Sequence, residues 1–138
     1  MKSSHLFNNK FYLSNILDND LSIKYDEIVN YISSFNQYLV SLNIKAQKKI
    51  LLIAENSNQT AMIIISLLAN NRICIPVNPK SSIDEIKYII NDSKVSNVFV
   101  ETKYKYKLKK IKFKNKILIN SKFSKKLIRL KKNLKFSS

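Results

Sequence analysis

Three short apolar runs, separated by segments long enough to form helices, constrain the fold of this chain more than any other feature. The runs occupy residues 49–54, 73–77 and 97–100. The first contains Ile50-Leu51-Leu52-Ile53 without polar alternation, which is typical of a strand covered on both faces of a sheet. Strands that alternate with helices over about fifty residues require right-handed crossovers and a parallel sheet. The order of the runs therefore predicts an α/β fold.

Helical periodicity and capping signals occupy the intervening segments. Apolar residues at steps of three and four between Tyr25 and Leu42 predict a helix of about eighteen residues. Residues 61–69 fit a strand or a helix by periodicity alone, but polar capping groups at residues 57–60 favour a buried helix. Ser82-Ile83-Asp84-Glu85 predicts a capping box, in which the Ser hydroxyl and the Glu carboxylate each satisfy an unpaired amide at a helix start.

The absence of glycine from all 138 residues limits the chemistry of the chain. A glycine-rich phosphate loop is excluded, because such loops need residues without side chains where backbone amides approach phosphates. The dinucleotide fingerprint and the P-loop are therefore both excluded. A genome poor in G and C is a sufficient explanation, since such a genome supplies few glycine codons.

Charge divides the chain into two unequal parts. Residues 1–101 hold ten Lys or Arg and nine Asp or Glu, a net charge of +1, whereas residues 102–138 hold fifteen basic residues and no acid, a net charge of +15. We therefore expect residues 1–101 to form an α/β region and residues 102–138 to form a Lys-rich strand and helix extension.

The basic extension allows more than one function. Lysines interleave with Tyr104, Tyr106 and Phe113, a pattern typical of contact with single-stranded nucleic acid. Arg129 is the only arginine among the fifteen basic residues, so polyanion contact would be nonspecific and salt-sensitive. Residues 124–136 fit an amphipathic helix for an anionic membrane surface or a partner. A solvated lysine face with no ligand is the remaining alternative.

Few other side chains fit catalytic or metal-binding roles. Cys74 lies between Ile73 and Ile75, which predicts a small buried apolar side chain and permits a reducing compartment. His5 is the only histidine, so neither a metal cluster nor a catalytic triad can be built around it. Asp84 and Glu85 point apart on a helix. We expect no catalytic, cofactor-binding or metal-ligating residue.

The N-terminal segment predicts a local turn and no targeting signal. Residues 12–17 and 21–24 flank Asp18-Asn19-Asp20, which predicts a short hairpin. Residues 1–20 lack the continuous apolar core of a secretory signal. The longest apolar run, residues 61–69, is far below the ~20 residues that cross a bilayer. We expect no transmembrane segment and a cytoplasmic location.

Four motifs, in order along the chain, resemble the opening motifs of one enzyme family. Lys24-Tyr25-Asp26-Glu27-Ile28 resembles Thr-Tyr-x-Glu-Leu, with Lys24 in place of the usual Thr. Ala54-Glu55-Asn56-Ser57 resembles an Asn-centred turn after a strand, and Ile75-Pro76-Val77-Asn78-Pro79 resembles Val-Pro-Leu-Asn-Pro. Glu85 to Ser93 is similar to Glu-Leu-x-Tyr-x-Leu-x-Asp-Ser. The chain thus resembles the N-terminal subdomain of the AMP-dependent synthetase/ligase superfamily, the acyl-adenylate-forming enzymes.

The clearest departure from the family pattern is Asn71, where these enzymes nearly always have Gly after a helix. That position needs a left-handed conformation, and Asn is the next best residue for it. The resemblance implies a partial three-layer arrangement of a parallel sheet and flanking helices. It also implies that residues 116–120 are the next strand, preceded by a Lys-rich surface helix.

The resemblance implies a ligase that uses ATP and Mg²⁺, but no cofactor site in this chain. The family's phosphate loop, ribose-binding Asp and catalytic Lys lie beyond the equivalent of Glu101, and none of these motifs is present. We therefore expect a truncated N-terminal fragment that is inactive alone. It is either one piece of a split ligase, with the remaining part as its partner, or a truncated product. The matched residues are expected to be core contacts, turn makers and caps: Tyr25, Glu27, Pro76, Asn78 and Tyr88.

Overall fold

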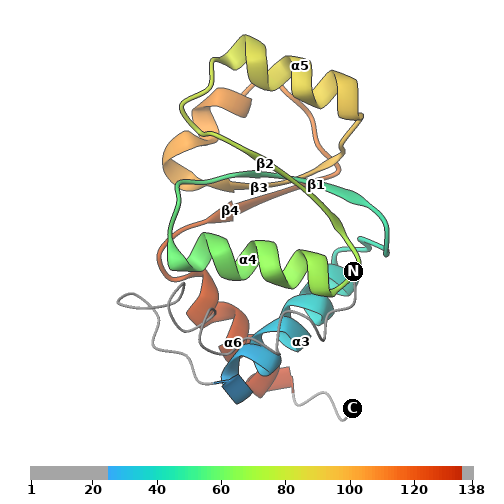
Figure 1. The fold of residues 1–138 in the computed structure, drawn as a ribbon, viewed down its shortest axis with the longest axis vertical. Coiled ribbons are helices and arrows are strands. Elements are labelled where there is room, and N and C mark those ends of the chain that lie inside the picture. Colours follow the sequence, from blue (N-terminus) through green and yellow to red (C-terminus); the bar gives the residue numbers. More distant parts are fainter. Residues whose placement is uncertain (1–24, 135–138) are drawn as a thin grey trace.

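The computed structural model describes residues 25–134, and their side chains up to residue 128 (Figure 1). The hairpin expected at residues 12–24 and His5 lie outside this range. Nine elements follow in order: α3 Tyr25–Ser41, β1 Lys49–Ile53, α4 Asn58–Ala69, β2 Ile73–Val77, α5 Ile83–Ser93, β3 Asn97–Glu101, the 3₁₀ helix η1 Thr102–Leu108, β4 Asn115–Ile119 and α6 Phe123–Leu134. The predicted helices and strands within residues 25–100 are confirmed, with ends that differ by a few residues.

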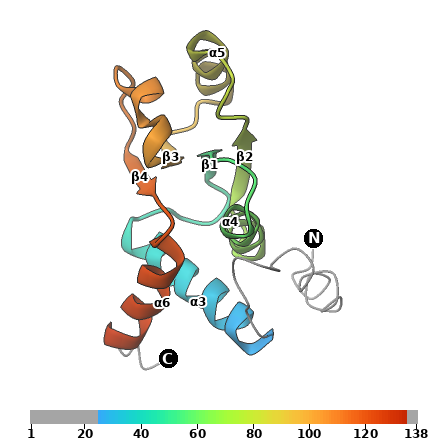
Figure 2. The ribbon, with the colours of Figure 1, turned by 90° about the vertical axis from the view of Figure 1, so that its left-hand side faces the viewer.

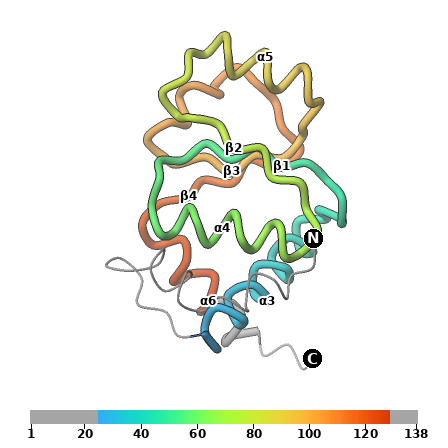
Figure 3. Tube along the Cα trace, in the orientation of Figure 1, coloured from blue at the N-terminus to red at the C-terminus, as the bar shows by residue number. Residues whose placement is uncertain are grey.

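The four strands form one parallel sheet in the order β2-β1-β3-β4. The register places Ile50 of β1 beside Cys74 of β2 and Asn97 of β3. The chain crosses from β1 to β2 through α4 on one face of the sheet and from β2 to β3 through α5 on the other (Figure 3). The α/β class and the three-layer arrangement are therefore confirmed.

Strand alternation divides the core between the two faces of the sheet. Ile50, Leu52 and Phe99 pack with α3, α4 and α6 in one buried cluster. Leu51 and Ile53, on the opposite face of β1, pack with α5 and η1 in a second cluster. Figure 2 shows the sheet between these two layers. Every residue from Ile50 to Ile53 is buried, which explains why β1 lacks polar alternation.

The helix α3 forms because its apolar residues recur at helical spacing on one face. Ile28, Tyr31, Phe35 and Leu39 are all buried. Asp26 and Glu27 lie in the first turn, where negative charge meets the positive end of the helix dipole. Its buried face contacts both α4 and α6, so α3 joins the middle of the chain to its C-terminal part.

Capping and turn residues set the ends of α4 and α5. The Ser57 side chain accepts a hydrogen bond from the Thr60 N–H at the start of α4. The capping box of Ser82 and Glu85 is present, as predicted. Asn71 has φ 61°, which confirms the left-handed conformation expected where the family has Gly. Lys94 ends α5 in the same conformation, with φ 58°.

The basic extension is integrated with the rest of the fold. β4 pairs with β3 along residues Asn97–Glu101, and α6 packs on α3. The Phe123 ring lies 6.2 Å from the ring of Phe35, between centroids. Leu127 and Ile128, two of the apolar residues expected to lie on an amphipathic helix, also contact the core. Leu127 is buried in the cluster that contains Phe35, and Ile128 packs against that cluster. The segment before β4 is a 3₁₀ helix, which refines the expected surface helix.

Polar contacts fix α6 to α3 and α4. The Gln59 Oε1 accepts hydrogen bonds from the Ser124 N–H at 3.0 Å and the Ser124 hydroxyl at 2.8 Å. Because this uses the Ser124 proton, the Tyr31 hydroxyl is the donor in the 2.9 Å bond between Tyr31 and Ser124. Burial raises the pKa of Tyr31, so the phenol stays protonated and keeps this bond.

Candidate functional site at the carboxyl edge of the sheet

The strand order places a topological switch point between β1 and β3. From β1 the chain moves outward to β2, and from β2 it returns across β1 to β3. In open parallel sheets, ligands bind outside the carboxyl ends of the strands at such a point. The segments that leave these ends are Ala54–Ser57 after β1, Asn78–Ser82 after β2 and η1 after β3.

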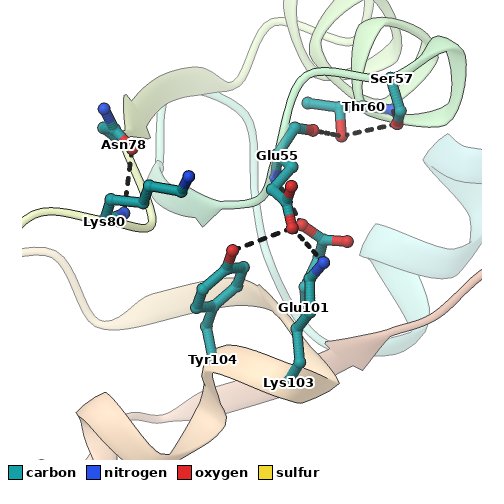
Figure 4. A network of polar contacts seen from close by, with 8 residues as sticks. All are labelled: Glu55, Ser57, Thr60, Asn78, Lys80, Glu101, Lys103 and Tyr104. Carbon is teal, nitrogen blue, oxygen red and sulfur yellow. Dashed lines mark hydrogen bonds and ion pairs between the residues drawn. The ribbon is translucent and has the colours of Figure 1, made fainter.

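A polar network spans the carboxyl ends of β1 and β3 (Figure 4). The Glu55 carboxylate accepts a hydrogen bond from the Tyr104 hydroxyl at 2.9 Å. The same carboxylate forms a salt bridge with Lys103. The Glu101 carboxylate in turn accepts a hydrogen bond from the Glu55 N–H. Two strands and η1 are thus joined by four side chains at the switch point.

The network leaves Glu55 ill suited to act as a general base. Hydrogen bonds from Lys103 and then Tyr104 hold the pKa of Glu55 below its ordinary value. The hydrogen bond with Glu55 raises the pKa of Lys103 and also raises the pKa of Tyr104. At neutral pH the three groups are therefore a carboxylate, an ammonium and a neutral phenol, with none poised to exchange a proton.

A cavity of about 500 Å³ lies beside this network, between the carboxyl ends of β1 and β2. Apolar and polar residues line it in about equal number. The apolar ones are Leu52, Ala54, Ile64, Pro76, Val77 and Pro79, and the polar ones are Glu55, Asn56, Thr60, Asn78 and Lys80. This size suits a small organic group. Such a mixed lining can position a small group but offers no activated nucleophile.

The rim of the cavity is shaped by local hydrogen bonds. The Asn78 Oδ1 accepts a hydrogen bond from the Lys80 N–H at 2.9 Å, which confirms Asn78 as a turn maker. The Thr60 hydroxyl donates to the Glu55 carbonyl at 2.7 Å and accepts from the Ser57 hydroxyl at 3.1 Å. These contacts tie the loop after β1 to the first turn of α4.

The residues singled out in the sequence are placed apart from one another. Cys74 is a free cysteine on the edge strand β2, and its partial burial raises its pKa to about 11, so the thiol stays protonated. Glu85 is held in the capping box, where the Ser82 N–H lowers its pKa. Asp84 is exposed. Among the described residues, no group of three or more His, Cys, Asp or Glu could hold a metal ion.

Tyr88 and Pro76, two of the five residues matched to the family, are exposed, whereas the set was expected to be core contacts, turn makers and caps. Tyr88 is 69% exposed on α5, so it is not a core contact. Ile86 and Ile90 point to the core, and a residue midway between them on a helix points to solvent. Pro76 is exposed on β2, where it lines the cavity.

Sequence reasoning missed the Glu55 network. Glu55 follows β1, and Lys103 and Tyr104 follow β3, so they lie 48 and 49 residues apart in the sequence. The sequence feature that could have revealed the network is that Glu55, Lys103 and Tyr104 all follow closely after predicted parallel strands. The carboxyl ends of adjacent parallel strands meet at one edge of the sheet.

No helix in the described range 25–134 is both long enough and apolar enough to cross a membrane.

Comparison with known proteins adds a family-level match. Residues 7–136 match the model of a family described as AMP-binding enzyme. A search of curated protein sequences gives no match.

Several solved structures share the fold. A benzoate CoA ligase from Burkholderia xenovorans LB400 matches 92% of this chain with a TM-score of 0.70 and 15% identity. A fatty acyl CoA synthetase from Mycobacterium tuberculosis matches 78% with a TM-score of 0.66 and 16% identity. The anthranilate CoA ligase AuaEII, solved with anthranoyl-AMP, matches 77% with a TM-score of 0.66 and 14% identity. The matches span 28%, 22% and 22% of those chains, so this chain covers about a quarter of their length.

Proposed function

This chain belongs to the AMP-binding enzyme family, and we propose on that basis that its 138 residues are the N-terminal α/β segment of an AMP-forming acyl or carboxylate ligase. The observation that carries the proposal is that the family match over residues 7–136 includes the whole parallel sheet and both of its helical layers. The fold shared with three CoA ligases and synthetases supports the same assignment.

The proposed reaction of the intact ligase has two steps. A carboxylate oxygen attacks the α-phosphorus of ATP, and pyrophosphate leaves as the bond to the β-phosphate oxygen breaks. A thiol of coenzyme A or a carrier then attacks the acyl carbon, and AMP leaves. ATP and Mg²⁺ are the proposed cofactors of the intact enzyme, and a cytoplasmic location is part of the same proposal.

The residues of this chain have a supporting role in that reaction. The sequence has no glycine with which to build a glycine-rich phosphate loop. At the switch point, Glu55 is engaged by Lys103 and Tyr104, so the carboxyl edge offers a fixed surface in place of a free acid or base. We therefore propose that the 138 residues alone do not form an acyl adenylate.

ATP–pyrophosphate exchange tests this inactivity. The purified chain, supplied with ATP, Mg²⁺, labelled pyrophosphate and a panel of aliphatic and aromatic carboxylates, should give no exchange above a protein-free blank. A complete benzoate CoA ligase assayed with benzoate is the positive control. Carboxylate-dependent exchange by this chain would disprove inactivity while leaving the family assignment intact.

The remaining part of the ligase is the proposed partner. Reading the DNA that follows the Ser138 codon in all three forward frames should reveal a Ser/Thr/Gly-rich loop and the later ligase motifs. Co-expression of that segment with this chain should then produce a complex that performs the exchange. A following sequence with no ligase motif in any frame would remove the support for a split enzyme.

The lysines of residues 102–138 favour a second candidate function, noncatalytic binding of polyanions. Between residues 103 and 126 every lysine except Lys107 is exposed, and no acid interrupts them. Deletion of residues 103–138 is unsuitable as a test, because it removes β4 from the sheet and Phe123 and Leu127 from the core. Charge-neutralising substitutions test the same function without disturbing the fold.

A further inference from the structure

The exposed lysines between residues 103 and 126, here called the basic stripe, follow one side of the molecule. η1, β4 and α6 succeed one another down that side, with β4 as an edge strand of the sheet (Figure 2). The lysines of the stripe belong to these three elements and to the loops between them. The stripe therefore draws on consecutive elements of one edge of the fold, with a break at residues 117–121, which contain no lysine.

A base composition poor in G and C does not explain the stripe by itself. The same bias acts on the whole gene, yet residues 1–101 hold nine acids against ten basic residues and residues 102–138 hold none against fifteen. Asp and Glu codons are as available to one part as to the other. The absence of Asp and Glu from residues 102–138 therefore needs an explanation other than base composition.

Only a few lysines of the stripe have partners within the protein. Lys103 forms a salt bridge with Glu55, and Lys116 donates to the Leu108 carbonyl at 3.2 Å. Among the side chains described up to residue 128, no other lysine of the stripe has a carboxylate partner. Unpaired ammonium groups this close together repel one another. A phosphate backbone would neutralise them and release its condensed counterions, which is the main driving force of nonspecific nucleic-acid binding.

One aromatic side chain within the stripe is free to stack. Tyr106 is 60% exposed on η1. Residues three apart align on a 3₁₀ helix, so the C-cap residue Lys109 follows Tyr106 on the same face. Tyr104, by contrast, donates its hydroxyl to Glu55, and the Lys103 ammonium lies 5.4 Å from its ring centroid. An exposed ring flanked by lysines is the arrangement that binds a base and its phosphates.

The packing of α6 argues against an anionic membrane as the ligand. An interfacial helix needs a free apolar face to enter the lipid. In α6, Phe123 and Leu127 are 9% and 4% exposed and pack in the core cluster with α3. The apolar face of the described part of α6 is therefore already covered.

We propose that the basic stripe binds single-stranded nucleic acid without sequence preference, with Tyr106 as a stacking platform. This inference rests on the candidate function of polyanion binding and adds the class of partner. Each lysine ammonium attracts a phosphate as a point charge. Bidentate hydrogen bonds to bases are made mainly by Arg, so a surface of lysines selects no base sequence. Stacking is what separates a nucleic acid from other polyanions, since every base has a π-face.

The experiment compares two oligonucleotides of equal charge. The full chain is titrated into a labelled oligothymidylate of about twenty nucleotides and into an abasic strand of the same length, and the anisotropy is followed at several salt concentrations. The oligothymidylate should bind more tightly than the abasic strand. Tyr106→Ala should weaken oligothymidylate binding about tenfold and leave abasic binding unchanged. Tyr88→Ala, at a tyrosine 69% exposed on α5, is the matched control and should change neither.

Lysine variants test the stripe separately. Lys105→Gln, Lys109→Gln and Lys110→Gln combined should weaken both ligands and reduce the slope of log K against log salt by about 2, because each contact with a single strand contributes about 0.7. Lys45→Gln, Lys48→Gln and Lys87→Gln combined, which change exposed lysines outside the stripe, are the matched control and should leave the slope unchanged.

The outcomes separate the two proposals. An unchanged slope in the stripe variant would overturn polyanion binding and the nucleic-acid inference with it. A reduced slope with equal binding of the two oligonucleotides would keep polyanion binding and overturn the role of Tyr106. Tighter binding to phosphatidylserine vesicles than to oligothymidylate at the same salt would assign the stripe to membranes and overturn the inference.

Discussion

Arg72 shows how a single residue can join distant parts of this chain. It is 7% exposed, and its guanidinium donates to the Asn36 Oδ1 at 2.9 Å, the Asn70 carbonyl at 2.7 Å and the Ile44 carbonyl. These acceptors belong to α3, to the loop that follows it and to the end of α4. No local sequence pattern predicts this role, because two of the acceptors lie 36 and 28 residues away in the sequence.

Removing the Arg72 side chain should therefore destabilise the fold. Arg72→Ala leaves buried carbonyl groups without donors, and we expect the free energy of unfolding to fall by about 3 kcal/mol. Urea denaturation followed by circular dichroism measures the change. Lys45→Ala, at an exposed position next to Ile44, is the control and should alter stability little. Equal stability of the two variants would contradict the proposed role of Arg72.

Glu55 gives the fold a predictable dependence on pH. Hydrogen bonds from Lys103 and Tyr104 hold its pKa below the ordinary value of 4.5. Such a carboxyl stabilises the folded state above its unfolded pKa, and this contribution is lost as the pH falls through the folded pKa. Glu55→Gln should therefore be less stable than the wild type at neutral pH and lose less stability as the pH falls below 4.5.

Urea denaturation at a series of pH values measures this effect. Asp92→Asn removes an exposed carboxylate at the far end of α5 and should keep the wild-type dependence on pH. Identical pH profiles for Glu55→Gln and the wild type would mean that the Glu55 network does not stabilise the fold.

Residue-level predictions from the sequence succeeded where the governing contact is local. Asn71 adopts the left-handed conformation and Glu85 caps α5, because both properties depend on neighbours within three residues. The Glu55 network depends on strands that meet only in the folded sheet, and no local pattern specifies its partners.

At the scale of elements, α6 shows the same limit. Its amphipathic pattern predicted a helix, and residues Phe123–Leu134 confirm it. Periodicity shows that a helix has an apolar face but not what covers that face, and the cover here is α3, about ninety residues earlier. A membrane or a partner was an equally good expectation from the sequence.

Phe123 anchors α6, and its removal should be costly. Its ring centroid lies 6.0 Å from that of Tyr38 and 6.1 Å from that of Phe99. Phe123→Ala should lower the free energy of unfolding by about 3 kcal/mol through lost burial and the cavity left behind. Chemical denaturation measures it, with Val40→Ala at a residue 59% exposed as the control. A loss no larger than that of Val40→Ala would show that α6 does not depend on this contact.

For the molecule as a whole, the boundary suggested by charge at residue 101 does not coincide with a gap in the packing. β4 extends the sheet from β3, and the core cluster beneath the sheet includes Ile119, Phe123 and Leu127 from the basic part. A shift in composition therefore describes the surface of this chain better than its core. Helix and strand assignments, which depend on buried residues, were the more reliable guide to the fold.

Residues 1–101 alone should fail to fold cooperatively. The truncation removes β4 and α6 and uncovers Phe35 and Phe99, which are fully buried in the intact chain. We expect a broad thermal transition by circular dichroism and aggregates by size-exclusion chromatography, whereas the full chain should unfold in a single sharp step. A sharp transition for the truncated chain would show that the basic part is a separate folding unit.

The glycine-free turns have a consequence for engineering. Within residues 25–134, four residues with side chains adopt positive φ: Asn43, Gln47, Asn71 and Lys94. A side chain in this conformation costs about 1 kcal/mol or more, less for Asn. The described part of this small protein therefore carries this cost at several turns. Gly at Gln47 or Lys94 therefore offers a direct route to a more heat-resistant chain, without altering the sheet, the basic stripe or the carboxyl edge.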